Sequence, residues 1–175
     1  MINGLELNEP ATDSAEGHAR SLHGLNTAAV YGIWQRALEL RHTDPEGAIA
    51  SARSLLERVC RLVLDERGIA YSDALDVSVL MKMTVEQLNL APAGASETAF
   101  KRMLASAATV VDRLGSLRNK IAGARGDRER PVKPSAHHAQ LAVNIAGTAA
   151  IFIVETWEAR VEEEFFELID DSKGG

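Results

Sequence analysis

The sequence predicts an all-α protein, built as an antiparallel bundle of about five helices. Apolar residues recur at intervals of three and four along several long segments, which is the period of an α-helix. No segment alternates polar and apolar residues as a half-buried strand does. With 175 residues, 46% of them hydrophobic, the chain is large enough for one domain with its own core.

The first predicted helix follows a segment without a sustained period. Residues 1–25 carry three glycines, a proline and scattered acidic residues, and we interpret them as a loose arm. Asn26 or Thr27 is the expected N-cap of a helix that runs to about His42.

The second predicted helix has clear signals at both ends. Asp44 before Pro45 is a typical start, because proline is favoured at the first helical position. The helix should run to about Glu66, since Gly68 follows as a C-terminal stop. Its apolar face is wide, so we expect it at the centre of the bundle. The only cysteine, Cys60, lies on that face, and we interpret it as a core residue and not as a nucleophile.

The third and fourth predicted helices are separated by a proline-containing loop. The third is expected from about Asp76 to Leu90. Ser96 is the expected N-cap of a long fourth helix over residues 97–122, where Gly123 allows the chain to leave the helix.

The last predicted helix is long and unusually apolar. A loop with two prolines spans residues 126–134, and Ser135 is the expected N-cap of a helix that reaches about Ile169. Residues 141–157 are apolar on nearly all sides. Polar residues interrupt that run and glutamates follow it, so we expect a buried helix and not a membrane span.

The helical domain is therefore expected to span residues 26–170, before a flexible tail at 171–175. The net charge of −6 argues against a protein that covers nucleic acid with its whole surface. Charge is distributed unevenly, with a net +4 over residues 118–133 and −7 over 155–171. A local basic segment on an acidic protein fits a confined phosphate site, and the alternative is a solvated loop with surface charges.

The fourth helix carries the most informative pattern in the chain. One face is followed at alternating steps of four and three by Phe100, Leu104, Ala107, Val111, Leu114, Arg118, Ile121 and Arg125. Arg118 and Arg125 lie about two turns apart, so both point the same way if the helix continues past Gly123. A guanidinium on a core-facing stripe needs an anion or water, so we expect either a structural ion pair or an anion site.

Arg53 and Glu57 on the central helix are further candidates. Their i, i+4 spacing allows an ion pair worth about 0.2–0.5 kcal/mol. The alternative is that both side chains line the same pocket as Arg118.

Nothing in the sequence indicates a metal, a cofactor or a targeting signal. Paired cysteines, a glycine-rich phosphate loop and a dinucleotide fingerprint are all absent. His137 and His138 are adjacent, so on a helix they point about 100° apart and do not easily share one metal. Because no secretory signal heads the chain and one cysteine suits a reducing compartment, we expect a cytoplasmic protein that does not associate with a membrane.

Four short runs together resemble a known family. They are ARSLLE at 52–57, LRNK at 117–120, PVKPS at 131–135 and LAVN at 141–144. Their order and spacing are similar to the abortive-infection C-terminal domain family of the HEPN superfamily, which contains helical ribonuclease and nucleotide-binding domains. The resemblance covers roughly two thirds of the chain and implies a HEPN-like bundle.

Active members of that family share an Arg-polar-x(4–6)-His motif, which in this branch is close to Arg-Asn-Lys-x-x-Asp-Ala-His-Gly. The residues of this chain that match it are Arg118, Asn119, Lys120, Ala124 and Gly126. The histidine position holds Arg125, and the aspartate position holds Gly123.

The resemblance implies metal-independent RNA cleavage at the face of a homodimer, in a phage-defence or toxin system. The motif arginine would hold the scissile phosphate, the histidine would transfer a proton at the 2′-hydroxyl, and Asn119 would position these groups. Arginine keeps its proton near neutral pH, so Arg125 is unable to act as a general base, and we expect impaired or absent cleavage.

The candidate site therefore has two parts. The catalytic candidates are Arg118, Asn119, Arg125 and Glu57, and the phosphate-binding candidates are Arg53, Lys120, Arg128, Arg130 and Lys133. Two alternatives remain open: a dimeric module that binds RNA or a nucleotide phosphate without cleaving it, and a purely structural bundle in which Arg118 pairs with Glu57. The sequence identifies neither the RNA target nor an antitoxin or sensor partner.

Overall fold

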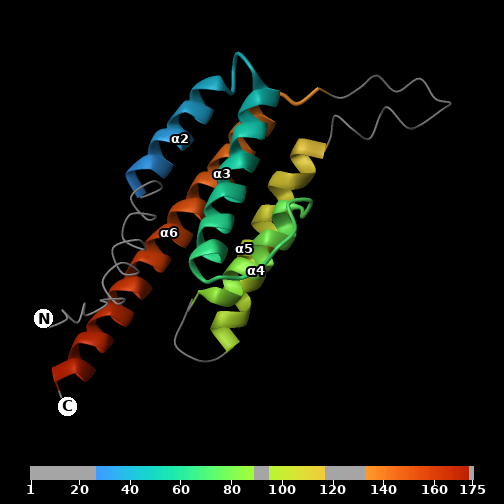
Figure 1. Cartoon of the computed structure of the whole chain (residues 1–175). Helices are drawn as coiled ribbons and strands as arrows, with labels where there is room; N and C mark the ends of the chain where they lie inside the picture. Colours follow the sequence, from blue (N-terminus) through green and yellow to red (C-terminus); the bar gives the residue numbers. More distant parts are fainter. Residues whose placement is uncertain (1–26, 89–94, 117–132, 174–175) are drawn as a thin grey trace, which may run out of the picture.

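The computed structural model describes residues 27–88, 95–116 and 133–173, and the regular secondary structure in these ranges is entirely helical (Figure 1). The helices are α2 Thr27–Leu40, α3 Pro45–Glu66, α4 Val77–Gln87, α5 Ala95–Ser116 and α6 Ala136–Lys173. This confirms the predicted all-α bundle with five helices. The expected bounds agree within a few residues wherever both ends are described.

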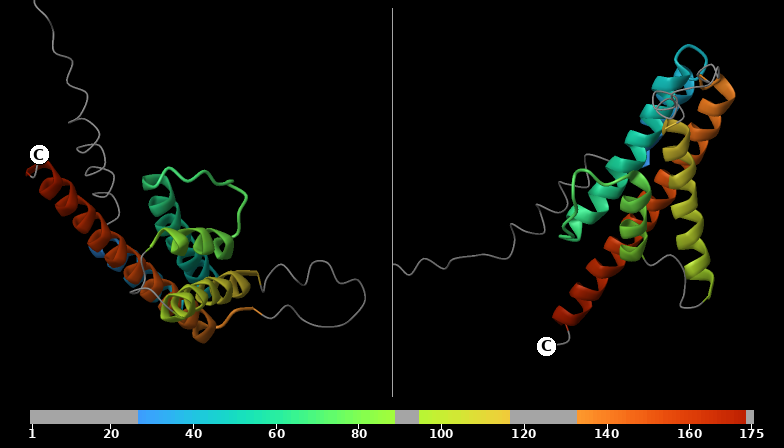
Figure 2. Two further views of the ribbon diagram at one scale, coloured as in Figure 1. Left: turned by 90° about the horizontal axis from the view of Figure 1, so that it is seen from below. Right: turned by 90° about the vertical axis from the view of Figure 1, so that its right-hand side faces the viewer.

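The central helix of the bundle is α3, as its wide apolar face predicted. It packs against α2, α4, α5 and α6 (Figures 1 and 2). Its buried residues are Ala48, Ile49, Ala52, Leu55, Leu56, Val59, Cys60, Val63 and Leu64. The predicted start and end of α3 are both confirmed. At the start, the Asp44 side chain accepts a hydrogen bond from the Gly47 backbone N–H at 2.9 Å. After the end, Gly68 adopts a φ of +65°, which glycine allows.

The longest helix, α6, runs along the bundle and projects beyond it (Figure 1). Its first half packs on α2, α3 and α5, and the residues fully buried there include Ala142, Ala146, Ala150 and Ile153. Within the described residues this is the one helix long and apolar enough to cross a membrane, and 56% of its most apolar window is buried inside the protein. Burial of this kind is typical of the core helix that we expected.

A glycine permits unusually close packing between α2 and α6. A Cβ atom added at Gly147 would lie 2.5 Å from Cγ and Cε2 of Trp34. Because the indole lies directly on the α6 backbone at this point, only glycine fits. The same indole packs beside Tyr31, with ring centroids 5.8 Å apart.

The buried line of α5 differs from the predicted stripe. Leu104, Ala108 and Val111 are buried, as is typical of a helix covered by α3, α4 and α6. Phe100, which the spacing placed on the core face, is 40% exposed, and Leu114 is half-buried. The core face of α5 is thus turned toward Ala108 and away from Phe100.

We expect Gly147→Ala to destabilise the fold by about 1–3 kcal/mol, because the new methyl group overlaps the Trp34 ring. Chemical denaturation followed by circular dichroism measures this change. The matched control is Gly32→Ala on α2, where the added Cβ meets only Arg36 NH1 at 3.9 Å. That control should be neutral or stabilising by up to about 1 kcal/mol, since alanine favours the helix. Equal effects at both positions would contradict the close packing.

Candidate functional site

Most of the predicted site residues lie in one segment that is outside the described residues. Arg118, Asn119, Lys120, Arg125 and the basic residues at 128 and 130 all belong to the segment 117–132. Their roles therefore stay predictions. The structure describes the residues on either side of this segment, and the remaining candidates on α3 and before α6.

A small pocket lies where this segment leaves and returns to the bundle. Its volume is about 160 Å³, and it is lined by Glu46, Ile49, Ala50, Arg53, Leu114, Gly115 and Pro134. The described part of α5 ends at Ser116, one residue past this lining, and Pro134 follows the segment directly. The motif arginine, Arg118, comes two residues after Ser116 in the sequence and lies outside the described residues.

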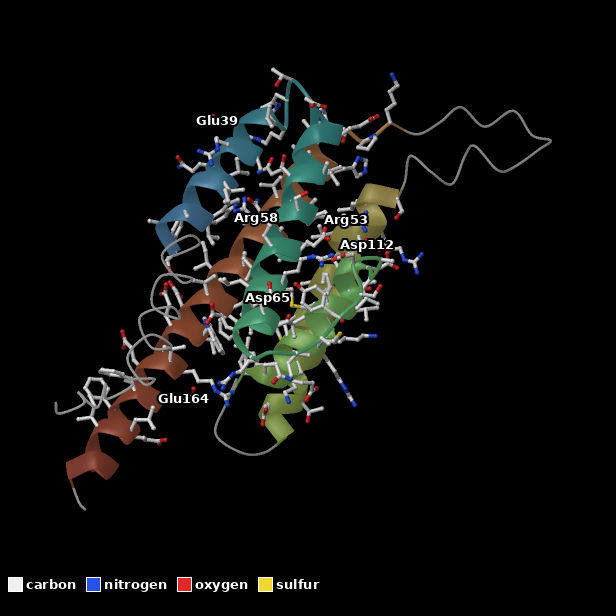
Figure 3. The ribbon with its side chains drawn as sticks, viewed as in Figure 1. Glu39, Arg53, Arg58, Asp65, Asp112 and Glu164 are labelled. Carbon is white, nitrogen blue, oxygen red and sulfur yellow. The ribbon has the colours of Figure 1, made fainter. Side chains whose placement is uncertain are left out.

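Arg53 crosses from α3 to two other helices at the edge of this pocket (Figure 3). Its Nε lies 3.3 Å from Oδ1 of Asp112 on α5, and its NH2 lies 3.8 Å from Oδ1 of Asp76, the N-cap of α4. Neither contact has hydrogen-bond geometry, and Nε has no hydrogen-bond partner. With the Arg53 side chain 40% exposed, the pairs contribute at most about 1 kcal/mol. Because Nε is buried, only the two terminal nitrogens of the guanidinium can donate to an anion.

The prediction that Arg53 and Glu57 form an ion pair is wrong. Glu57 instead accepts a hydrogen bond from Arg61 NH2 at 2.9 Å. This pair has the favourable order, with glutamate four residues before arginine, whereas Arg53 precedes Glu57. Glu57 is not among the residues that line the pocket. The structure thus places Arg53 at the pocket and leaves Glu57 outside its lining.

Arg61 ties Glu57 to the loop that follows α3. Its NH1 donates to Oδ1 of Asp73 at 2.9 Å, and its guanidinium lies 5.0 Å from the centre of the Tyr71 ring. The pKa of Arg61 is raised above its usual value. The largest cause is the hydrogen bond to Glu57, and the second largest is the hydrogen bond with Tyr71. Tyr71 in turn donates to Oδ1 of Asp65 at 2.7 Å. Glu57 thus belongs to a polar cluster that holds the loop in place.

Lys133 lies just before α6, and His137 and His138 lie in the first turn of that helix. Lys133 and His137 are exposed. The Ser135 backbone N–H donates to Nδ1 of His138 at 3.0 Å, and the Ser135 Oγ lies 2.9 Å from the same atom. Because Nδ1 accepts that N–H, the neutral ring carries its proton on Nε2. His138 thus closes a capping arrangement at the expected N-cap, and its Nδ1 is unavailable as a base.

Neither the acidic partners of Arg53 nor the role of His138 was apparent from the sequence. Asp76 precedes a helix, so its position in the sequence indicates an N-cap. Asp112 directly follows the core residue Val111, which indicates that it lies close to the core. Their pairing with Arg53 depends on how α4 and α5 pack on α3, which one sequence does not reveal.

Cys60 is a core residue, as predicted. Its side chain is fully buried, and burial raises the pKa of the thiol to about 12, partly offset by a hydrogen bond with Thr84. A thiol with this pKa is not ionised near neutral pH and is a poor nucleophile. Among the described residues, no group of three His, Cys, Asp or Glu side chains is placed to hold a metal ion.

Comparison with known proteins identifies one family. The model of the Abi_C family, a HEPN-like domain, matches residues 28–157. The matched range begins in α2, ends in α6 and includes the segment 117–132. No curated protein matches the chain. No solved structure matches it either.

We expect the Cys60 thiol to resist alkylation by iodoacetamide at pH 8 in the folded protein and to react fully in denaturant. Burial and the raised pKa together suppress the thiolate. Mass spectrometry after timed labelling measures the modified fraction. Rapid labelling without denaturant would show that α3 is less protected than its packing indicates.

Proposed function

The chain belongs to the Abi_C family of HEPN-like domains, and from this premise we propose that it acts on RNA in a phage-defence or toxin system. In this proposal it is a metal-independent endoribonuclease domain whose activity is impaired by Arg125 at the histidine position. The RNA phosphate sits at the pocket between α3, the end of α5 and the start of α6.

The observation that carries this proposal is the position of the pocket at both ends of the motif segment. Arg53 lies on the pocket wall, Lys133 is exposed next to Pro134, and Arg118 follows Ser116 by two residues in the sequence. In this proposal, positive groups from three parts of the sequence meet where the phosphate binds. The basic segment 118–133, with its net charge of +4, supplies further contacts.

The reaction requires two proton transfers in addition to charge stabilisation. The 2′-oxygen attacks the adjacent phosphorus, the bond from phosphorus to the 5′-oxygen breaks, and a 2′,3′-cyclic phosphate forms. The 2′-hydroxyl loses a proton to a base, and the leaving 5′-oxygen gains one from an acid or from water. Arg118 would stabilise the charge on the phosphate, but Arg125 is unable to exchange a proton near pH 7.

The second candidate function is a module that binds RNA or a nucleotide phosphate without cleaving it. Three observations favour it over efficient catalysis. Arg125 retains its proton, Nδ1 of His138 is engaged by Ser135, and Glu57 is paired with Arg61. Both functions use the same cationic pocket, so a cleavage assay distinguishes them.

We expect Arg125→His to raise RNA cleavage by about 10²–10⁴-fold, because one general base typically contributes that factor. The double change Gly123→Asp with Arg125→His restores the family pattern more fully. Cleavage of a mixed RNA pool is measured in chelator, with end analysis for 2′,3′-cyclic phosphate. Arg118→Ala in the Arg125→His background is the control and should abolish the gain. Folded histidine variants that bind RNA and cut none of it would leave the binding module as the function.

RNA affinity should fall by about tenfold in Arg118→Ala and by about fivefold in Arg53→Gln, the latter equal to about 1 kcal/mol. Each change removes a cation at the pocket. The matched control is Arg58→Gln, an exposed arginine on the same helix that does not line the pocket (Figure 3). Fluorescence anisotropy at two salt concentrations measures the affinity. Equal losses for Arg53→Gln and Arg58→Gln would show that binding depends on total charge and not on this pocket.

A further inference from the structure

The C-terminal end of α6 projects beyond the rest of the bundle (Figure 1). Glu158, Arg160 and Glu164 bond to the ends of α2, α4 and α3, and the helix then continues to Lys173. The family match covers residues 28–157 and stops where this projection begins. The projecting end therefore adds a surface that lies outside the matched range.

Three large apolar side chains are exposed on this projection. Phe165 is 58%, Phe166 68% and Leu168 71% exposed, and the two aromatic rings pack edge to face with centroids 6.3 Å apart. Leu168 and Phe166 are more exposed than any other large hydrophobic residue in the described part of the chain. Apolar side chains that gather in one exposed place are typical of a binding surface, whereas single ones are common on any protein.

A row of carboxylates lies beside these apolar side chains. Glu163, Glu167 and Asp170 follow one another at steps of four and three, so they share one side of the helix. All three are exposed, and none forms an ion pair with another described residue. Residues 158–170 contain six acidic residues and one arginine, a net charge of −5. The row and the three apolar residues together form a surface that we call the C-terminal face.

A surface hollow of about 420 Å³ lies in the C-terminal face. It is lined by Phe166, Glu167, Ile169 and Asp170. An aromatic ring, an aliphatic side chain and two carboxylates are the surroundings that suit a lysine or an arginine. The aliphatic stem of such a side chain packs on the apolar wall, and its charge lies against the carboxylates and the ring. The hollow therefore has the chemistry of a site for a cationic side chain.

The charges at this helix end are unfavourable in the free chain. Carboxylates near a helix C-terminus lie at the negative end of the helix dipole. Glu163 and Glu167 are spaced i, i+4, so their like charges repel on the helix surface. The exposed aromatic and leucine side chains order water around them as well. A partner that brings both apolar and basic groups would relieve all three effects at once.

We propose that the C-terminal face binds a basic amphipathic helix of another protein. The apolar stripe of such a helix covers the exposed phenylalanines and Leu168, and its lysines or arginines reach the hollow and the row of carboxylates. RNA and anionic membranes are repelled, because they carry the same sign of charge as this face. A second copy placed face to face would oppose two rows of carboxylates. The proposal is independent of the proposed RNA function.

A synthetic peptide of leucine and lysine serves as the probe. It has about 18 residues, five helical turns, with leucine along one side and lysine on the other. Fluorescence anisotropy measures its binding to the whole chain. We expect the dissociation constant to rise at least about tenfold in Leu168→Ser, because an apolar contact at the centre of the face is lost. A whole chain that does not bind the peptide would overturn the proposal.

The matched control for the apolar contact is Met103→Ser. Met103 is 64% exposed, nearly as much as Leu168, but lies on α5. Its substitution should leave the affinity unchanged. Equal or greater loss in Met103→Ser would place the peptide elsewhere on the protein and overturn the proposal.

The double change Glu167→Gln with Asp170→Asn tests the charges of the hollow. We expect the affinity for the peptide to fall at least about fivefold and to depend less on salt. Glu39→Gln is the control, because Glu39 is an exposed carboxylate on α2 (Figure 3). A peptide of the same composition, with leucines on all sides of the helix, should bind at least about tenfold more weakly. Equal binding of the two peptides would show that charge alone attracts them, contrary to the proposal.

Hydrogen exchange of the whole chain locates the site. Amides of residues 165–170 should exchange rapidly in the free chain, because this end is exposed and unfavourably charged, and slowly when the peptide is bound. Strong protection in the free chain would show that the chain itself or a second copy already covers the face. That result, or protection by the peptide only at other residues, would overturn the proposal. Because no assay contains RNA, failure here leaves the proposed RNA function untouched.

Discussion

Burial of α3 on four neighbouring helices is the constraint on which the rest of the structure depends. Nine of its residues are buried, and each fully buried Leu, Ile or Val contributes about 1.5–3 kcal/mol relative to exposure. A change that separates α3 from α5 or α6 would therefore move the pocket wall as well as the core, because the first turns of α3 supply most of that wall.

Two arginines on α3 and one at its C-cap form ion pairs with other parts of the bundle. Arg53 reaches α5 and the start of α4, and Arg61 reaches the loop after α3. Arg67 donates to Oε1 of Glu164 on α6 at 2.6 Å and lies 4.8 Å from the centre of the Trp157 ring. Arg67 is also the main cause of the lowered pKa of Glu164. Of these three arginines only Arg53 lies at the pocket, and its ion pairs lack hydrogen-bond geometry, which suits the phosphate-binding role that we propose for it.

The helices were predictable from sequence because their signals are local. Asp44 and Pro45 mark the start of α3, and Gly68 marks the turn after its end. Each of these residues determines the backbone only within a few residues of its own position. The partner of Arg53 was not predictable, because the i, i+4 rule considers one helix, whereas Asp112 comes from another. The face of α5 was misjudged for the same reason. An apolar residue such as Phe100 fits a core or an interface equally well, and only the packing of α3 and α4 distinguishes them.

The candidate site combines a described pocket with a motif that lies in the adjoining segment. The pocket wall is where the proposed phosphate site lies, and the chain belongs to a family of HEPN-like domains. In the proposed function, the identity of residue 125 decides which chemistry is possible, since an arginine binds phosphate but exchanges no proton near pH 7. Under that proposal, binding and cleavage depend on different residues of one site.

The central claim is that RNA binds where the segment 117–132 joins the bundle. Photo-cross-linking of the chain to an oligonucleotide containing 4-thiouridine, followed by peptide mass mapping, tests this claim most directly. Adducts are predicted in peptides from residues 113–138 and from the first turns of α3, near Arg53. Adducts confined to α2 or to the acidic tail at 155–171, at RNA concentrations that saturate binding, would contradict it.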